Sequence, residues 1–387
     1  MEEKVFIGLV VLVLAATLLV YGPQITGQAT SDFSAQQANT NAFISVWKTD
    51  NLGVSENNQI RLPLEPKGEY DFFIDWGDNT SSHISRYDQE AITHSYENPG
   101  TYTITIQGTL KGWRFNNAGD KEKILEITQW GNISLGNNNA YFHGAKNLII
   151  TAQDTPNLSE TTSLKQAFEN AQSLTITAAN NWDTSTITNM HSTFKNAQSF
   201  NNDISKWDVS SVSTMTSLFE EARNFNQPIN DWDVSSTTDM TRMFYGATSF
   251  NQPLHDWDTQ SLITTAAMFA YAENFNQDLN NWNTQSLTST NHMFAHATNY
   301  NHGFENWNIS SITSMNEMLK NTQISTHHYD QTLQEWASQE VQENVLLGAG
   351  NTQYCISENA RAQLINNHAW NITDAGKHPS CEEIIRG

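Results

Sequence analysis

The sequence predicts a β-rich chain in which a small β-sandwich precedes an α/β solenoid and a C-terminal cap. Three observations support this fold class. Residues 42–110 alternate apolar and polar side chains in short runs that end at turn residues. A pattern of 25 or 26 residues then recurs about eight times over residues 124–325. Both cysteines of the 387-residue chain lie beyond residue 350, in the segment that would close the repeats.

The first residues are predicted to be a targeting segment. Residues 5–21 are almost wholly apolar and follow Lys4, the one basic residue beside them. A helix of this length spans about 26 Å, slightly less than a bilayer core of about 30 Å. We therefore expect residues 1–29 to be a signal peptide or a single-pass anchor that places the body outside the cytoplasm, and residues 30–41 to be a linker.

The net charge and the absence of catalytic motifs restrict the classes of function that the chain can have. The chain has 41 acidic and 19 basic residues, for a net charge of -22. Such a body repels phosphate backbones and anionic lipids, and no Lys/Arg cluster offsets it. The sequence also lacks a GxSxG elbow, a P-loop and a GxGxxG turn. We expect a non-catalytic protein without a cofactor, a metal or a nucleic-acid partner.

The cysteine pair agrees with export. Cys355 and Cys381 are 26 positions apart and have no CxxC spacing, so zinc and redox sites are disfavoured. In an exported protein such a pair predicts a disulfide. We expect it to fasten a C-terminal cap over residues 326–387.

The segment 42–110 carries a family signature. Residues 70–74 lead into Asp75-Trp76-Gly77-Asp78-Asn79-Thr80, and residues 94–100, with His94, Tyr96 and Gly100, precede an alternating run over 101–106. These residues resemble the PKD domain, an immunoglobulin-like sandwich. Asn79 stands where that family has glycine, and Asn tolerates a positive φ. The resemblance implies a spacer or a carbohydrate- or protein-binding accessory, joined to the repeats by residues 111–123.

Two carboxylates in this signature, Asp75 and Asp78, suggest either calcium binding or local turns. A calcium site needs six or more oxygen ligands, and no further ligand cluster is evident nearby. Side chains that cap their own turn explain both residues. We favour the turn.

The repeats are defined by two series of aromatic residues. Tryptophans recur at intervals of 25, and a Phe-x-x-Ala pair recurs at intervals of 25 or 26. The block Met240, Met243, Phe244, Ala247 has the i, i+3, i+4, i+7 spacing of a short amphipathic helix. Extended runs such as 148–150, 174–176, 200–204, 225–229 and 250–254 predict one strand per repeat. The series that we expect to form the repeat core are Trp182, Trp207, Trp232, Trp257, Trp282 and Trp307, with Phe194, Phe219, Phe244, Phe269 and Phe294.

Each position that recurs in successive repeats has a structural and a functional interpretation. Exposed tryptophans would be platforms for sugars, but one fixed position per repeat is typical of a core ladder. The row Asn201, Asn226, Asn251, Asn276, Asn301 is expected to bond neighbouring backbones. The row Asp183, Asp208, Asp233, Asp258, Asn283, Asn308 either satisfies turn amides, which we favour, or forms an acidic strip.

The repeats resemble the BspA-like leucine-rich-repeat surface proteins, in the form found in mycoplasma surface lipoproteins. Residues 225–236, FNQPINDWDVSS, carry this resemblance, together with segments 43–51 and 115–121 and the tail around 329–333, 348–355 and 360 onward. The chain departs from the lipoproteins because no cysteine lies near its N-terminus. The resemblance implies a surface-exposed protein, sometimes an adhesin, with a leucine-rich-repeat-type solenoid.

The candidate ligand-binding residues are those that change between repeats on the predicted strand side. They are Lys206, Asn230, His255, Asn280 and Glu305. His292 and His296 have the i, i+4 spacing of a zinc helix, but Met293 replaces the required Glu, so a metal site with His302 is disfavoured.

We therefore predict recognition or adhesion through the repeats, with an extracellular protein or glycan as partner. One alternative is a carbohydrate-binding accessory that uses the PKD-like module, and the other is a structural component of the cell envelope.

Overall fold

The computed structural model describes residues 40–382, which belong to one compact unit. The expected targeting segment and almost all of the linker fall outside these residues. Within the described range, no helix has the length and apolar character needed to cross a membrane.

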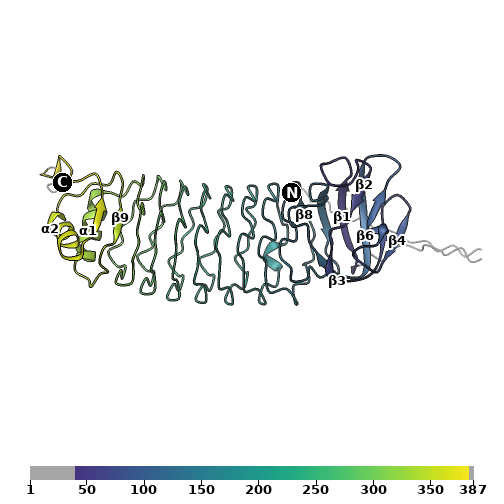
Figure 1. Ribbon diagram of the computed structural model, residues 1–387, viewed down its shortest axis with the longest axis horizontal. Helices are drawn as coiled ribbons and strands as arrows, with labels where there is room; N and C mark the ends of the chain where they lie inside the picture. Colours follow the sequence, from purple (N-terminus) through teal and green to yellow (C-terminus); the bar gives the residue numbers. More distant parts are fainter. Residues whose placement is uncertain (1–39, 383–387) are drawn as a thin grey trace, which may run out of the picture. The chain divides into compact units, whose positions relative to one another are not determined.

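A six-stranded sheet forms the N-terminal part of the described chain (Figure 1). Its strand order is β4-β3-β6-β1-β7-β8, and β2 and β5 pair separately. In β1 every second residue is buried, and Phe43 and Trp47 point into the core while Ile44 and Val46 are partly exposed. The strands are β1 (Phe43–Lys48), β2 (Gln59–Arg61), β3 (Leu64–Asp75), β4 (Ser81–Ile84), β5 (Thr93–Ser95), β6 (Thr101–Trp113), β7 (Ile124–Gln129) and β8 (Ile149–Ile150), with a 3-10 turn η1 (Glu90–Ile92).

The sheet continues into the repeats without a break. Strand β6 passes the expected boundary at Leu110 and ends at Trp113, and β7 pairs with β1. Strand β8 pairs in parallel with β7, and Ile150 bridges Ile176 in the next repeat. The first repeats therefore extend the same sheet.

The prediction of an α/β solenoid of the leucine-rich-repeat type is wrong. Between β8 and residue 326 the chain has turns, a 3-10 turn η2 (Ala179–Asn181) and single-residue parallel bridges, but no α-helix. Of the expected strands, only 149–150 forms, as β8; those at 200–204, 225–229 and 250–254 do not. The two α-helices of the described chain, α1 (Thr326–Ala337) and α2 (Glu358–His368), both follow the repeats (Figure 1).

Backbone conformation explains why the Met240–Ala247 block is not helical. Arg242 and Gly246 have φ values of 57° and 65°, in the left-handed region, whereas a helix requires φ near −60° throughout. The N–H of Arg242 donates to the Ala266 carbonyl of the next repeat at 2.8 Å. The N–H of Met243 instead donates to the Met240 carbonyl at 3.1 Å, within its own turn. Within this block some backbone N–H groups therefore donate to the next repeat and others donate within their own turn.

The same two positions are left-handed in successive repeats. The first set is Gln166, Ser192, Ser217, Arg242, Ala267, His292 and Glu317, and the second is Asn170, Asn196, Glu221, Gly246, Tyr271, His296 and Asn321. We call these fourteen residues the corner positions. They turn the chain back at each repeat, so its apolar side chains stay inside.

Stacked rings fill the interior of the repeats. Phe219 lies 5.6 Å from Phe244 in the next repeat and 3.8 Å from Phe225 in its own, with nearly parallel planes. The six tryptophans of the repeat series are between 0 and 4% exposed. The indole N–H of Trp232 donates to the Ile204 carbonyl of the preceding repeat at 3.1 Å. Trp207, Trp257, Trp282 and Trp307 make the same kind of bond.

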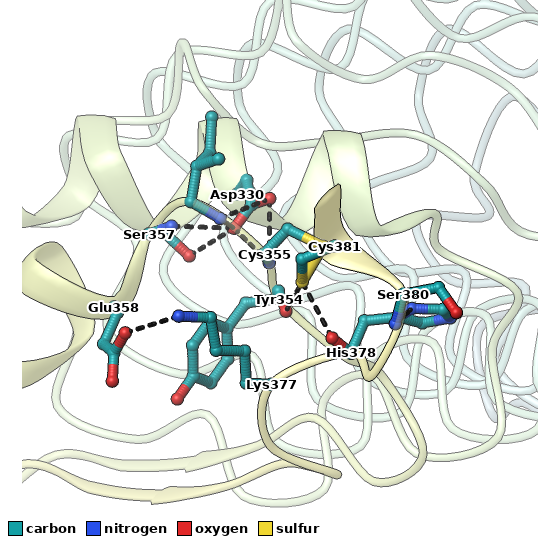
Figure 2. Close-up of a disulfide and its surroundings, with 10 residues drawn as sticks. Asp330, Tyr354, Cys355, Ser357, Glu358, Lys377, His378, Ser380 and Cys381 are labelled. Carbon is teal, nitrogen blue, oxygen red and sulfur yellow. Dashed lines mark hydrogen bonds and ion pairs between the residues drawn. A yellow bond between two sulfur atoms is a disulfide. The ribbon is translucent and has the colours of Figure 1, made fainter. Parts of the chain in front are cut away.

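The C-terminal cap ends the repeats with a short parallel sheet and two helices. Strand β9 (Leu346–Gly348) pairs with β10 (Asn371–Thr373) and, through Leu347, bridges Met315 of the last repeat. The expected disulfide between Cys355 and Cys381 is present, and Figure 2 shows it beside Asp330. The buried Asp330 carboxylate accepts the N–H groups of Cys355, Ile356 and Ser357 at 3.0–3.1 Å. This carboxylate joins α1 to the start of α2.

Removing the disulfide should increase local opening of the C-terminal cap without affecting the repeats. Closing a loop of this length stabilises a folded chain by roughly 3 kcal/mol, mainly by restricting the unfolded state. In a Cys355→Ser, Cys381→Ser double variant we expect faster hydrogen exchange in α2 and β10. Backbone amides near Phe219 that donate to a neighbouring repeat serve as the internal control. If hydrogen exchange accelerates equally there, the disulfide does not act on the cap alone.

The indole hydrogen bonds supply a second test, because one tryptophan lacks such a bond. The Nε1 of Trp182 is buried with no hydrogen-bond partner among the described residues. Trp232→Phe should lower the free energy of unfolding by about 1 kcal/mol more than Trp182→Phe, because it alone removes a hydrogen bond, after which the Ile204 carbonyl keeps only the N–H of Trp207. Denaturant unfolding of the two variants measures the difference. Equal losses would show that the indole bonds contribute nothing beyond packing.

Candidate recognition surface on the repeats

Three neighbouring repeats place aromatic rings beside their corner positions. Tyr271 is 42% exposed, and its ring lies parallel to that of His296 at 4.5 Å. On the other side Tyr245 lies 5.2 Å away, tilted by 57°. The Arg242 guanidinium sits 3.7 Å above the Tyr245 ring. We call Arg242, Tyr245, Tyr271 and His296 the ring strip.

A buried carboxylate holds one end of the ring strip. Glu220 is 5% exposed and accepts two hydrogen bonds from Arg242, at 2.6 Å to Nη2 and 3.0 Å to Nε. The Lys195 ammonium lies 3.3 Å from the same carboxylate. Burial alone would raise the pKa of Glu220, but the hydrogen bonds from Arg242 and Ser217 and the two positive charges outweigh it and lower the pKa. The guanidinium is therefore fixed before any ligand arrives.

At the other end, His296 and His292 face polar partners. His296 Nδ1 lies 3.2 Å from the Asn321 amide nitrogen, and His292 Nδ1 lies 3.5 Å from Glu317. The i, i+4 spacing of the two histidines does not form a zinc-binding helix, because both residues occupy left-handed corner positions. His302 contacts the Asn276 carbonyl at 3.2 Å. Among residues 40–382, no group of three His, Cys, Asp or Glu side chains is placed to hold a metal ion.

The five predicted ligand residues lie on a different part of the repeats. Lys206 and His255 are exposed, and the other three are partly buried. Asn230 accepts from the N–H of Asp256 at 3.2 Å, and Asn280 donates to Glu305 at 3.1 Å, so both amides link successive repeats. At the 25-residue interval, Ser205 rather than Lys206 matches the row. Ligand binding by these five residues stays a prediction.

The asparagine row bonds neighbouring backbones as expected. Asn201 Oδ1 accepts from the N–H of Asn226 at 2.9 Å, and Asn226 accepts from Asn251 at 2.9 Å. Asn251 and Asn276 continue the row toward Asn301. These amides replace backbone pairing in a segment that forms no strand.

The aspartate row satisfies turn amides, as we favoured. Asp183 Oδ1 accepts the N–H of Ser185 at 3.1 Å, and Asp233 accepts that of Ser235 at 3.0 Å. The serine hydroxyls and amides lower the pKa of both carboxyls. Asp208, Asp258, Asn283 and Asn308 repeat the geometry.

The turn of the PKD-like signature is likewise locally satisfied. Asp75 accepts the N–H of Gly77 at 2.9 Å, and Asp78 accepts that of Thr80 at 3.0 Å. His94 Nε2 lies 2.8 Å from the second oxygen of Asp78. Asn79 has φ of 67°, the conformation for which glycine would otherwise be used. Turn formation accounts for both carboxylates.

The ring strip was not among the sites predicted from the sequence. The block Met240–Ala247, which contains Arg242 and Tyr245, was expected to be a helix. A helix would separate these side chains by its own turns, whereas the left-handed corners bring rings of successive repeats together. The recurrence of Tyr245, Tyr271 and His296 at intervals of 26 and 25 is the signal that could have found the strip.

A family model described as Mycoplasma protein of unknown function, DUF285, matches residues 162–274 and 254–347. The match lies on the repeats and the start of the cap, and it is compatible with the resemblance to mycoplasma surface proteins but does not confirm the BspA-like leucine-rich-repeat resemblance. It does not extend to residues 42–110, so the PKD-like resemblance gains no support from it. No curated protein and no solved structure matches the chain. The family match and the disulfide are compatible with an extracellular location.

The ion cluster under the ring strip should depend on pH. Because the folded pKa of Glu220 is lowered, its contribution to stability is present above the unfolded pKa of about 4.3 and is lost as pH falls through the folded pKa. We expect Glu220→Gln to destabilise the protein at pH 7 by about 2 kcal/mol. The gap to the wild type should narrow below about pH 4.3.

Thermal unfolding from pH 3 to pH 7 tests this prediction. Glu221→Gln is the matched control, because that neighbouring carboxylate is more exposed and pairs with the exposed Arg223. A gap between the wild type and Glu220→Gln that does not change with pH would contradict the assignment.

Proposed function

We propose that this chain is a non-catalytic recognition protein of the cell surface or extracellular space that binds other proteins through its repeats. The single observation that supports this most is the ring strip, which clusters Arg, Tyr and His on neighbouring repeats of an acidic molecule. Aromatic and arginine side chains carry most of the energy at protein interfaces. In the proposal, residues 1–29 direct export and either are removed or remain as an anchor.

The strip suits a protein better than a sugar. Sugar rings bind aromatic side chains by lying flat on an open ring face. His296 is stacked on one face of Tyr271, and Tyr245 lies 5.2 Å from the same ring at a tilt of 57°. Ring edges and hydroxyl groups are left for a partner, and these fit side chains and backbone groups.

Rigidity supports the same proposal. Arg242 is held by Glu220 and by the Tyr245 ring, and the rings hold one another. Ordering a mobile side chain on binding costs about 0.5–1.5 kcal/mol, and a strip that is ordered beforehand avoids this cost. The row Lys206, Asn230, His255, Asn280, Glu305 remains a second proposed contact region.

Binding of the full chain to a panel of purified extracellular proteins and glycans tests the proposal. Tyr271→Asn is the informative variant, because Asn321 occupies the same corner with φ of 58° and the backbone is preserved. For a protein partner we expect affinity to fall by roughly 30-fold, the loss of one interface hot spot.

Tyr87→Asn is the matched control, since Tyr87 is a surface tyrosine outside the repeats, 38% exposed. Equal losses in the two variants would refute a role for the ring strip. Saturable binding of glycans that survives Tyr271→Asn would favour the carbohydrate-binding alternative instead.

A further inference from the structure

A cleft where β2 and β3 meet the segment after β6 contains two arginines. It has a volume of about 290 Å³ and is lined by Arg61 and Arg114 together with apolar side chains that include Val54, Leu62 and Phe115. Val54 is 67% exposed at its edge. The cleft lies outside the repeats and outside the ring strip.

These arginines differ from the others in the described chain. Residues 40–382 contain six arginines, and Arg86, Arg223, Arg242 and Arg361 each lie within 3.2 Å of a carboxylate oxygen. Among the described residues, Arg61 and Arg114 have no carboxylate partner. In a chain with 41 acidic residues, two unpaired arginines in one cleft are not explained by a shortage of carboxylates.

One guanidinium is also incompletely hydrogen-bonded. Arg114 donates from Nη2 to the Asn116 side chain at 3.1 Å, while its Nε is buried without a partner among the described residues. A buried donor that lacks an acceptor destabilises the folded chain. An anion in the cleft would bind the accessible end of this guanidinium and so add an acceptor beside the buried Nε.

The backbone of the cleft is fixed by a buried carboxylate. Asp120 is fully buried and accepts the N–H groups of Val54 at 2.9 Å and of Arg61 at 2.7 Å. The N–H of Arg114 donates to the Pro63 carbonyl at 2.9 Å. Lys123, also buried, ties the loop before β2 through Ser55, Glu56 and Gln59. The backbone of both arginines is therefore fixed.

We propose that this cleft binds a carboxylate attached to an apolar group. Guanidinium groups match the planar carboxylate with paired hydrogen bonds, and the apolar wall requires a ligand that is not a bare ion. The volume is at the lower end for ligand sites and accommodates about one amino-acid residue. Two sources carry this chemistry: the C-terminal residue of a protein, and a free carboxylic acid.

Titration of the full chain with N-acetylphenylalanine, followed by NMR, tests the proposal. For a ligand of this size we expect a dissociation constant of about a millimolar. Its amide, which has no negative charge, should bind at least tenfold more weakly. Arg61→Gln should also weaken binding of the acid by roughly ten- to a hundredfold, because it removes a charged hydrogen-bond donor.

Arg223→Gln is the matched control, as it removes the same charge at an arginine that already has a carboxylate partner. Arg61 is exposed, so its variant should keep the thermal midpoint of the wild type, which is measured alongside. Equal binding of acid and amide, or equal losses in the two variants, would overturn the site. Binding of inorganic phosphate as tight as that of the acid would overturn the ligand class.

Two further probes separate the sources. An acetylated tripeptide ending in phenylalanine that binds more tightly than the single residue would support a protein C-terminus as ligand. Hexanoate that binds as well as N-acetylphenylalanine would support a free acid. None of these outcomes depends on the ring strip, so this proposal and the proposed function can fail separately.

Discussion

The peptide groups that bond one repeat to the next determine the rest of this structure. The peptide between Thr241 and Arg242 donates its N–H to Ala266 in the following repeat, and its carbonyl accepts from Ser217 in the preceding one. Peptides at the equivalent positions do the same from Gln166 to His292. A buried peptide must have both partners, and here both come from neighbouring repeats. No single repeat can satisfy its own backbone, so each is stable only between two others.

The hydrogen bonds between repeats also determine how equivalent side chains stack and keep the repeats nearly equal in length. When equivalent peptides lie one above the other, equivalent side chains must stack, so each Phe meets a Phe and each Asn amide meets the next backbone. The stack of repeats needs a terminating element at each end. Gly112 at the end of β6 donates to the Ser134 carbonyl, and Leu319 in the last repeat donates to Gly348 in β9. The sheet and the cap thus satisfy groups that would otherwise be exposed at the first and last repeats.

Features with local or periodic causes could be predicted from the sequence. The turns at Asp75 and Asp78, the asparagine ladder and the disulfide depend on neighbours at fixed spacing. The helix expected at Met240–Ala247 failed because i, i+3, i+4, i+7 spacing places apolar side chains inward in more than one backbone conformation. Left-handed corners occupied by Arg242, His292 or Glu317 have no compositional signal, since glycine or asparagine normally marks them. The arginine cleft joins residues 54, 61 and 114, and only the folded chain brings these together.

The distribution of charge follows from the same backbone. Seven Lys and Arg residues lie in residues 137–325, namely Lys146, Lys165, Lys195, Lys206, Arg223, Arg242 and Lys320. Five of them, all except Lys146 and Lys206, lie at or beside the corner positions, where side chains are free to vary. At the turns of the Asp row the side chain must accept an amide hydrogen, so the fold selects Asp or Asn there. The corner positions carry no such requirement, so charge and aromatic content can vary there. The corners are therefore a surface that can change without breaking the stack, and they carry the ring strip.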